Sequence, residues 1–415
     1  MRTEFDCTIV GAGIVGLAAA LRLQLDGLRI ALVERDEPAA GCSSGNAGYL
    51  SLGNVFPLAA PGVLRSLPRM LLDREGPLVV RPTYLPRLVP WGLRFLAASR
   101  SSRFESATQA LLRLTAPAIR AYDRLLEAAD AREIIQRRGG LHVYDSHSAL
   151  HRRLALRSLF AAHDIEIRAL TAHEVRDLEP ALRGEFAGAV FFPASVHCVN
   201  PRRLGERLAH RILAGGGELF RTHAGSLRQL ERGWEVHTAA GPIRTSRVLV
   251  SAGRWSDELL TPLGLRVPLE AERGYHLMLP QTDIGLGRPI VLAEKHFVVS
   301  PMEHGVRLAG TVEFAHRSAP PNPARADMLF AQAAAVLPAL RHRDATRWMG
   351  QRPTLPDSLP AIGTSARHPG LFYSFAHQHC GLTLAAVSAD LIADLVAGRE
   401  PTIDPRPYSL ERFRH

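Results

Sequence analysis

The glycine-rich segment Val10-Gly11-Ala12-Gly13-Ile14-Val15-Gly16 limits the possible folds of this chain more than any other stretch. It follows the short apolar run Cys7–Val10 and opens an Ala- and Leu-rich stretch, an order that predicts strand, turn and helix. Gly11 can adopt the backbone angles of a tight turn, Gly13 lets a pyrophosphate approach the main chain, and Gly16 lets the helix pack closely on the strand. The free N–H groups that begin such a helix favour an anion.

A second apolar run, Arg29–Val33, ends in Glu34, about 20 residues after the glycines, as dinucleotide-binding units require. A carboxylate at this point accepts hydrogen bonds from a ribose diol and repels a 2′-phosphate. The sequence therefore predicts a unit that binds an adenine dinucleotide with an unphosphorylated ribose.

The composition predicts a folded protein of two domains that share a cleft. The chain has 415 residues, of which 46% are hydrophobic and 22% charged, so it can bury a large core. Its four cysteines form no C-x-x-C pair and have no zinc or disulfide spacing, which predicts reduced thiols and no metal site. The first residues lack a basic segment before the apolar run, and no apolar run reaches about 18 residues, so we predict neither a signal peptide nor a membrane span.

The net charge of +10 comes almost entirely from arginines scattered along the chain. Scattered arginines are typical of a solvated surface, anionic lipid is the second interpretation, and nucleic acid is the third. The segment Phe56–Ala98 adds a local feature, because it mixes seven prolines with apolar residues and arginines. We expect a packed, irregular connection. The alternative is an interfacial loop that seats Trp91 and Phe95 in a membrane, with four arginines near the headgroups: Arg65, Arg69, Arg87 and Arg94.

Further segments predict the rest of the framework. Ser106–Arg138 reads as helical with a kink at Pro117, and His142 falls on a strand, where we expect it at a sheet edge. Asn200 and Pro201 predict a capped helix start. A strand at Leu371–Phe375 precedes the turn Ala376-His377-Gln378-His379-Cys380-Gly381-Leu382-Thr383 and a helix over Leu384–Val396, which repeats the anion-binding geometry of the N-terminus.

Arg352 lies in the proline-stiffened segment G-Q-R-P-T-L-P-D-S-L-P. Its planar fork suits a carboxylate. Tyr275 and His276 alternate faces on a predicted strand, so only one of them can point into a cleft.

These segments together resemble the D-amino-acid oxidase type of FAD-dependent oxidoreductase, most nearly the bacterial D-amino-acid and D-hydroxyproline dehydrogenases. The matching motifs are G-A-G-I-V-G with Glu34, S-S-G-N-A-G, V-S-A-G-R-W-S, R-G-Y-H-L, A-G-T-V-E-F, G-Q-R-P-T-L-P-D-S-L-P and A-H-Q-H-C-G-L-T-L. They occur in the family's order over nearly the full length. One departure is Ala376, where the family more often has glycine.

The resemblance implies an α/β fold (α+β overall), with a Rossmann-like FAD-binding domain and a substrate domain on a mixed β-sheet. The expected ranges are 1–80, 173–225 and 330–415 for the FAD domain, and 81–172 and 226–329 for the substrate domain. It also implies three catalytic residues, Arg352 as the carboxylate clamp with Tyr275 and His379 in the cleft. The implied contacts to noncovalent FAD are Gly11, Gly13, Ile14, Val15, Gly16, Glu34, Arg35, Ser43, Ser44, Asn46, Ala47, Gly48, Ala224, Gly253, Gly350, Gly381, Leu382 and Thr383.

The implied reaction is dehydrogenation of a D-amino or cyclic imino acid, by hydride transfer from Cα to flavin N5, giving an imine. The alternatives are an oxygen-using sarcosine or glycine oxidase and, more distantly, an NAD-dependent dehydrogenase; an RNA-binding protein with structural FAD ranks last. We expect a small-molecule substrate and no nucleic acid, a membrane quinone or similar electron acceptor, and a cytoplasmic protein. Attachment to the inner face of the cell membrane and partner subunits are kept as hypotheses.

Overall fold

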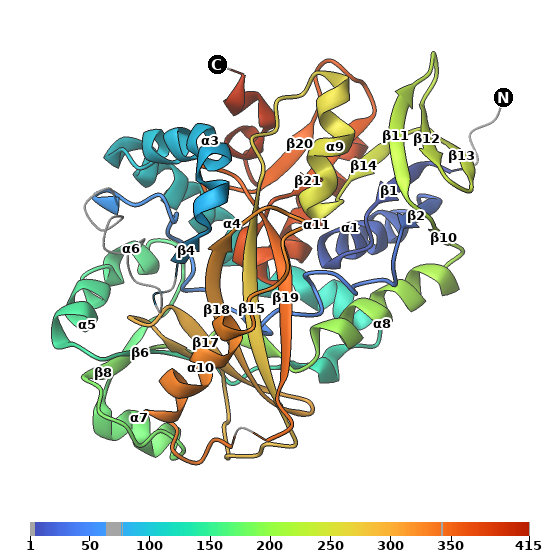
Figure 1. Cartoon of the computed structure of the whole chain (residues 1–415). Helices are drawn as coiled ribbons and strands as arrows, with labels where there is room; N and C mark the ends of the chain where they lie inside the picture. Colours follow the sequence, from blue (N-terminus) through green and yellow to red (C-terminus); the bar gives the residue numbers. More distant parts are fainter. Residues whose placement is uncertain (1–4, 64–75, 77, 342, 415) are drawn as a thin grey trace.

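The computed structural model describes residues 5–63, 76, 78–341 and 343–414. Its upper part is built on a six-stranded sheet with the order β10-β2-β1-β14-β21-β20 (Figure 1). All neighbouring pairs are parallel except β20 and β21. The strands are β1 (Cys7–Val10), β2 (Ile30–Glu34), β10 (Glu218–Arg221), β14 (Val248–Val250), β20 (Ala361–Thr364) and β21 (Leu371–Phe375). This assembly from distant chain segments confirms the predicted Rossmann-like unit.

Both faces of the six-stranded sheet are covered, which explains why its strands are continuously apolar. Cys7, Ile9 and Leu32 point into a core made with the helices α1 (Ile14–Leu25), α4 (Ser101–Ala128), α8 (Pro201–Ala214) and α11 (Gly381–Ala397). The alternate residues Val10 and Val33 point to the other face, where they pack with a three-stranded sheet of β11 (Ala224–Gln229), β12 (Trp234–Thr238) and β13 (Gly241–Thr245).

Within the described residues one helical stretch, Gln378–Ala397, has the length and composition to cross a membrane. About two thirds of its apolar window, 67%, is buried inside the protein. It is therefore accounted for as the core helix between α1 and α4.

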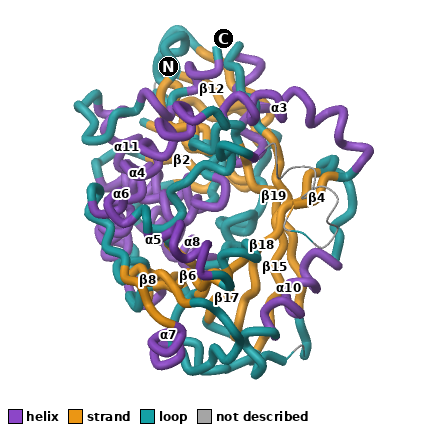
Figure 2. The backbone as a smooth tube through the Cα atoms, turned by 90° about the vertical axis from the view of Figure 1, so that its left-hand side faces the viewer, coloured by secondary structure: helices purple, strands orange, loops and turns teal. Residues whose placement is uncertain are grey.

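The lower part is a nine-stranded mixed sheet that runs β19-β15-β18-β17-β16-β6-β8-β7, with β4 paired to β18. Helix α10 (Ala324–Ala334) packs against β15 and β18, and this sheet has a core of its own. Figure 2 shows the long strands on the opposite side of the molecule from α4, α6 and α11. The strands are β4 (Leu78–Val80), β6 (Gly140–Tyr144), β7 (Arg168–Thr171), β8 (Gly188–Phe192), β15 (Glu270–Pro280), β16 (Ile290–Leu292), β17 (Phe297–Met302), β18 (Gly305–Phe314) and β19 (Thr346–Thr354).

Short elements complete the chain. The strands β3 (Tyr49–Leu50), β9 (Val196–Cys198) and β5 (Ile135–Gln136) form a small antiparallel sheet. The remaining helices are α3 (Leu85–Ala98), α5 (His147–Leu154), α6 (Arg157–Ala161), α7 (Ala172–Leu178) and α9 (Ser256–Leu260).

Several local predictions differ from the structure. Pro117 lies inside the continuous helix α4, which ends at Ala128 instead of continuing to Arg138. His142 is not at an edge, because β6 pairs with β16 on one side and β8 on the other. The segment expected to be irregular contains helix α3, with Pro90 inside it. The predicted cap at Asn200 is confirmed, since its Oδ1 accepts from the N–H of Arg203 at 3.0 Å.

The predicted substrate domain corresponds to the large mixed sheet, as the fold class requires. The sheets divide the chain differently from the expected ranges at four strands. β14 belongs to the six-stranded sheet, and β4, β8 and β19 belong to the large one. The exact domain ranges stay a prediction.

Candidate active site

A cleft with an empty volume of about 1350 Å³ opens beyond the carboxyl ends of β1, β2, β14 and β21. Ligands of doubly wound sheets bind at this edge. Many predicted cofactor residues line the cleft: Gly11, Gly13, Ile14, Val15, Glu34, Arg35, Ser43, Asn46, Ala224, Gly253, Gly381 and Leu382. Other predicted residues lie outside its lining: Gly16, Ser44, Ala47, Gly48, Gly350 and Thr383.

The three glycines of the first turn have different roles. Gly11 has a φ of +104°, and a Cβ there would come within 2.4 Å of the Ser251 carbonyl oxygen. A Cβ on Gly16 would lie 1.9 Å from the Gly11 oxygen, so Gly16 serves helix packing. A Cβ on Gly13 would meet only the Ser43 hydroxyl, at 3.5 Å, and would otherwise project into the cleft. The space in front of Gly13 is therefore the part that a ligand can occupy.

Polar groups around this turn suit an adenine dinucleotide. The N–H of Ile14, at the start of α1, donates to the Ser43 hydroxyl at 2.9 Å, and the helix has no side-chain cap. Glu34 Oε2 accepts from the N–H of Ala12 at 2.8 Å, which holds the carboxylate beside the turn. Four residues that line the cleft also carry buried polar atoms with no partner among the described residues: Ser251 Oγ, Ser374 Oγ, Gln351 Oε1 and His377 Nδ1. Such atoms are expected where a polar ligand completes the hydrogen bonding.

Sequence reasoning missed the aromatic wall of the cleft. The Arg35 guanidinium lies 3.6 Å from the centre of the Trp255 ring, and Arg254 lies 4.5 Å from the same ring. Both Arg254 and Trp255 line the cleft beside the predicted Gly253. The available signal was Trp255, two residues after Gly253, in the short turn that follows the buried strand β14.

The loop that carries Ser43 to Gly48 is held by the large sheet. Arg307 of β18 donates to the carbonyl oxygens of Ser44 and Asn46 at 2.9 and 2.5 Å, and burial lowers its pKa to about 10. His276 of β15 contacts the Gly45 carbonyl through Nδ1 at 3.0 Å. Burial lowers the His276 pKa to about 3, so the ring is neutral and donates this hydrogen bond.

Trp348 explains why one predicted glycine lies outside the cleft. Its ring stacks on His276 with centroids 4.9 Å apart and planes 12° from parallel. A Cβ on Gly350 would come within 2.1 Å of this ring, so Gly350 makes room for the tryptophan.

Further along β19 from Trp348, Arg352 lies near Glu272 of β15 and His379 of the turn before α11. Arg352 Nη1 donates to Glu272 Oε1 at 2.8 Å and to the Thr311 carbonyl at 3.2 Å. His379 Nδ1 lies 3.4 Å from the same Glu272 oxygen. The structure therefore brings Arg352 and His379 to one carboxylate, that of Glu272, which directly precedes the R-G-Y-H-L motif in the sequence.

Two backbone features make room for the Arg352 guanidinium. It packs over Gly274, where a Cβ would lie 2.1 Å from Arg352 Cζ. Opposite Gly274, the pairing of β15 with β18 shifts register, and Thr311 has a φ of +60°. A β-branched residue at positive φ is a genuine outlier, and such bulges commonly re-aim groups next to active sites.

In the turn before α11, the alanine that stands where the family more often has glycine lies in an unfavourable backbone conformation. Ala376 has a φ of +61° and Gln378 a φ of +50°, in the region where glycine is preferred. His377 and Gln378 line the cleft, while His377 Nε2 bonds the Ser388 hydroxyl at 2.9 Å. Burial lowers the pKa of His379, an effect that the Glu272 carboxylate partly offsets and Arg352 reinforces.

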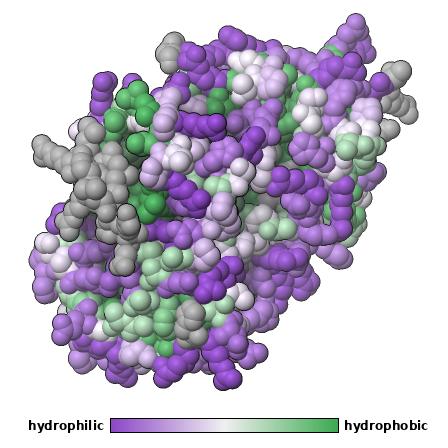
Figure 3. Space-filling model, viewed as in Figure 1, coloured by the Kyte–Doolittle hydropathy of each residue, from purple (hydrophilic) through white to green (hydrophobic). Residues whose placement is uncertain are grey.

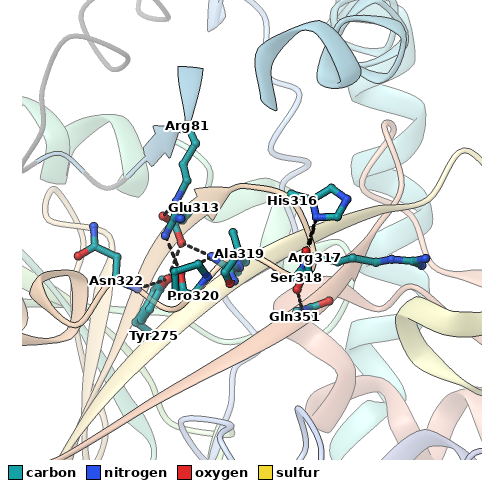
Figure 4. Close-up of polar contacts among 11 residues, drawn as sticks. Arg81, Tyr275, Glu313, His316, Arg317, Ser318, Ala319, Pro320, Asn322 and Gln351 are labelled. Carbon is teal, nitrogen blue, oxygen red and sulfur yellow. Dashed lines mark hydrogen bonds and ion pairs between the residues drawn. The ribbon is translucent and has the colours of Figure 1, made fainter. Parts of the chain in front are cut away.

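Tyr275 is the predicted residue that the structure does not bring to this cluster. Its hydroxyl donates to Glu313, and the N–H of Asn322 donates to it at 3.1 Å (Figure 4). Glu313 is also paired with Arg81 at 2.8 Å and Arg273 at 3.0 Å. Tyr275 is 2% exposed within the core of the large sheet, so it is His276 that contacts the loop of Ser43 to Gly48.

All four cysteines are free, and Cys380 Sγ lies 3.8 Å from the Asn54 carbonyl oxygen. Over the described residues no cluster of three or more histidines, cysteines or carboxylates could hold a metal ion.

With this geometry in place, the comparisons define the class of protein. Residues 6–395 match the family described as "FAD dependent oxidoreductase". The chain belongs to this family, FAD is its cofactor, and it is an oxidoreductase, as predicted.

Two relatives and one solved structure are similar to the chain over nearly its full length. The chain is 35% identical over 413 residues to a D-amino-acid oxidase from Bradyrhizobium diazoefficiens, covering 98% of each chain. It is 36% identical over 425 residues to D-amino acid dehydrogenase 2 from Ralstonia nicotianae, covering 98% of this chain and 99% of the relative. The glycine oxidase of Geobacillus kaustophilus shares the fold, with a TM-score of 0.76 at 22% identity over the full length of both chains.

Proposed function

We propose that this protein is an FAD-dependent dehydrogenase of D-amino acids or cyclic imino acids, including the D-hydroxyproline type. The observation that carries the proposal is the Arg352 guanidinium, held by a buried carboxylate next to the dinucleotide cleft. The names of the full-length relatives, a D-amino-acid oxidase and a D-amino acid dehydrogenase, support the substrate class.

Arg352 can clamp a carboxylate because its fork is only partly used. In the described part of the chain its hydrogen bonds run through Nη1, which leaves Nε and Nη2 for a ligand. Its side chain is 20% exposed, so a substrate can reach it. Two parallel hydrogen bonds to both carboxylate oxygens would fix which face of Cα meets the cofactor.

His379 is the second group that we assign to the substrate, at the amine. Its side chain is 33% exposed, and its lowered pKa keeps the ring neutral near pH 7. FAD, when bound, would take two electrons from the substrate as a hydride from Cα to N5, which leaves an imine. The chain's own residues would supply positioning, an effect worth up to about 7–11 kcal/mol when the geometry is ideal.

We assign the noncovalent FAD to the cleft, with its pyrophosphate before Gly13 and its ribose at Glu34. The predicted cofactor residues that line the cleft form the proposed set of contacts. Ser44, Ala47, Gly48, Gly350 and Thr383 are proposed to act by shaping the loop, sheet and helix that border the flavin end.

The test is the pair Arg352→Lys and Arg352→Ala. Lysine keeps the charge but loses the fork, so KM should rise and discrimination against amines without a carboxylate should weaken. Charge-assisted hydrogen bonds of about 1.5–3 kcal/mol correspond to roughly a 10- to 150-fold loss in kcat/KM. Variants that retain full flavin and unchanged kcat/KM on the best substrate would refute the assignment.

The similarity of the fold to that of a glycine oxidase supports one alternative function, that of an amine oxidase with oxygen as its electron acceptor. We favour transfer to a membrane quinone or another carrier, because a surface feature supports membrane contact. Leu85, Val89 and Leu93 lie one turn apart along α3 and are 49%, 49% and 63% exposed.

The exposed stripe of α3 differs from the predicted membrane contact. Trp91 and Phe95 face inward, with Trp91 stacked on Phe95 at 5.3 Å and near Phe314 at 5.6 Å. Arg87 and Arg94 are also exposed on α3, whereas Arg65 and Arg69 lie outside the described residues. Apolar surface gathers over α3 in the space-filling view (Figure 3). We propose that Leu85, Val89 and Leu93 enter the inner leaflet while the two arginines meet anionic headgroups.

A further inference from the structure

We propose that Glu272 is a positioning residue that makes His379 the acceptor of the substrate's ammonium proton. This inference rests on the proposed function, and it goes further by assigning the proton step to a carboxylate–histidine pair.

The two groups of the pair lie within ion-pair distance. Glu272 Oε1 lies 3.4 Å from His379 Nδ1, and the carboxylate itself is 1% exposed. A carboxylate cannot donate, so it favours the tautomer with the proton on Nδ1. The Nε2 lone pair then becomes the free acceptor of the ring.

Burial decides which residue can touch the substrate. With an exposed fraction of 1%, Glu272 is shielded, whereas the side chains of His379 and Arg352 are 33% and 20% exposed. Glu272 therefore acts through these two neighbours. Its Oε1 contacts both, so one carboxylate sets the spacing between the carboxylate clamp and the proton acceptor.

The proton balance is simple. An amino acid enters as a zwitterion, with its carboxylate on Arg352 and its ammonium near His379. An N–H bond of the ammonium breaks, an Nε2–H bond forms, and the amine keeps the electron pair that it needs for oxidation. The new imidazolium is stabilised by Glu272, and it returns the proton to water at the exposed part of the His379 side chain.

The charged groups that face His379 are Glu272 from β15 and Arg352 from β19, with opposite effects on its pKa. Removing the Glu272 charge while keeping its shape should therefore lower the His379 pKa. An opposite charge at this range commonly shifts a pKa by about 1 unit or more.

The decisive variant is Glu272→Gln in the FAD-loaded enzyme. We expect the His379 ring signal, followed by NMR without substrate and assigned with His379→Asn, to titrate about 1 pH unit lower than in the native protein. We also expect kcat to fall about 10-fold or more, with full flavin content. In a His379→Asn background, Glu272→Gln should have little further effect on kcat, and its remaining effect should fall on KM through Arg352.

Glu313→Gln is the matched control, because Glu313 is also 1% exposed in the large sheet but pairs with Arg81 and Arg273. It should lower stability without moving the His379 titration. Glu272→Asp, which keeps the charge, should retain a titration nearer to that of the native enzyme than Glu272→Gln does.

The two proposals fail differently. If no amino acid reduces the flavin, the proposed function fails, while the titration still reports on the pair. The inference would be overturned by an unchanged His379 titration in Glu272→Gln. It would also be overturned if the loss of kcat in Glu272→Gln added fully to the loss of kcat in His379→Asn.

Discussion

Gly274→Ala offers the sharpest structural prediction, because the glycine lies directly beneath the proposed carboxylate clamp. The added Cβ would lie 2.1 Å from Arg352 Cζ, 2.2 Å from Nη2 and 2.6 Å from Nε. Ordinary contact begins near 3.4 Å, so the guanidinium must move by about 1.3 Å. Gly274 has no positive φ, so alanine tests the side-chain clash and not backbone strain.

That displacement should break the 2.8 Å bond from Arg352 to Glu272. The loss of a charge-assisted hydrogen bond and a misplacement of about 1 Å together predict a fall of roughly 10- to 100-fold in kcat/KM, mostly through KM. Steady-state kinetics on the best substrate, with flavin content measured in parallel, provide the assay. Gly92→Ala is the control, since a Cβ there meets nothing within 4 Å.

A double-mutant cycle decides whether the effect runs through Arg352. In an Arg352→Ala background, Gly274→Ala should cost little more. Unchanged kcat/KM in Gly274→Ala, or a loss that persists undiminished without Arg352, would refute the reasoning.

Gly13→Val should yield folded protein that has lost most of its FAD, because its side chain projects into the cleft, whereas Gly16→Ala should disturb folding; a folded, fully flavinated Gly13→Val protein would contradict this. FAD should remain in the supernatant after acid precipitation, since burial raises the pKa of the Cys380 thiol to about 12 and keeps it from reacting as a thiolate; flavin in the pellet would show a covalent link. Cosedimentation with anionic liposomes should fall when Leu85, Val89 and Leu93 become serine but not for Leu213→Ser, a similarly exposed leucine on α8; equal binding by both would exclude the α3 stripe. Burial lowers the pKa values of His276 and His377 from 6.5 to about 3, so the unfolded chain binds protons at these residues at a higher pH than the folded protein does. The free energy of unfolding should therefore decrease as the pH drops from about 6.5 towards 3, by up to ~1.4 kcal/mol per pH unit for each histidine. A melting temperature that stays constant over this range would contradict the prediction.

The sequence predicted those parts of the site that depend on local backbone chemistry. The glycine turn, Glu34 and the capped helix at Asn200 follow short-range rules, so spacing alone located them. The parallel strands were also recognisable, because burial on both faces makes them continuously apolar.

What the sequence could not predict depends on pairing between distant strands. Tyr275 and His276 are adjacent in the sequence. Only the register of the sheet decides that His276 contacts the Gly45 carbonyl while the Tyr275 hydroxyl donates to Glu313. Glu272 meets Arg352 because β15 pairs with β19, 80 residues away in the chain. The orientation of Trp91 and Phe95 likewise depends on α3 packing against Phe314, which no local pattern reveals.

The central claim is that the chain uses FAD to oxidise an amino acid held by Arg352. Its most direct test is anaerobic reduction of the bound flavin by a panel of D-amino acids, their L-enantiomers, D-hydroxyproline, sarcosine and glycine. The account predicts that a D-amino or cyclic imino acid bleaches the flavin and that the Arg352→Ala enzyme responds far more weakly at the same concentration. Flavin that dithionite reduces but no member of the panel does, or that only L-enantiomers reduce, would contradict the account.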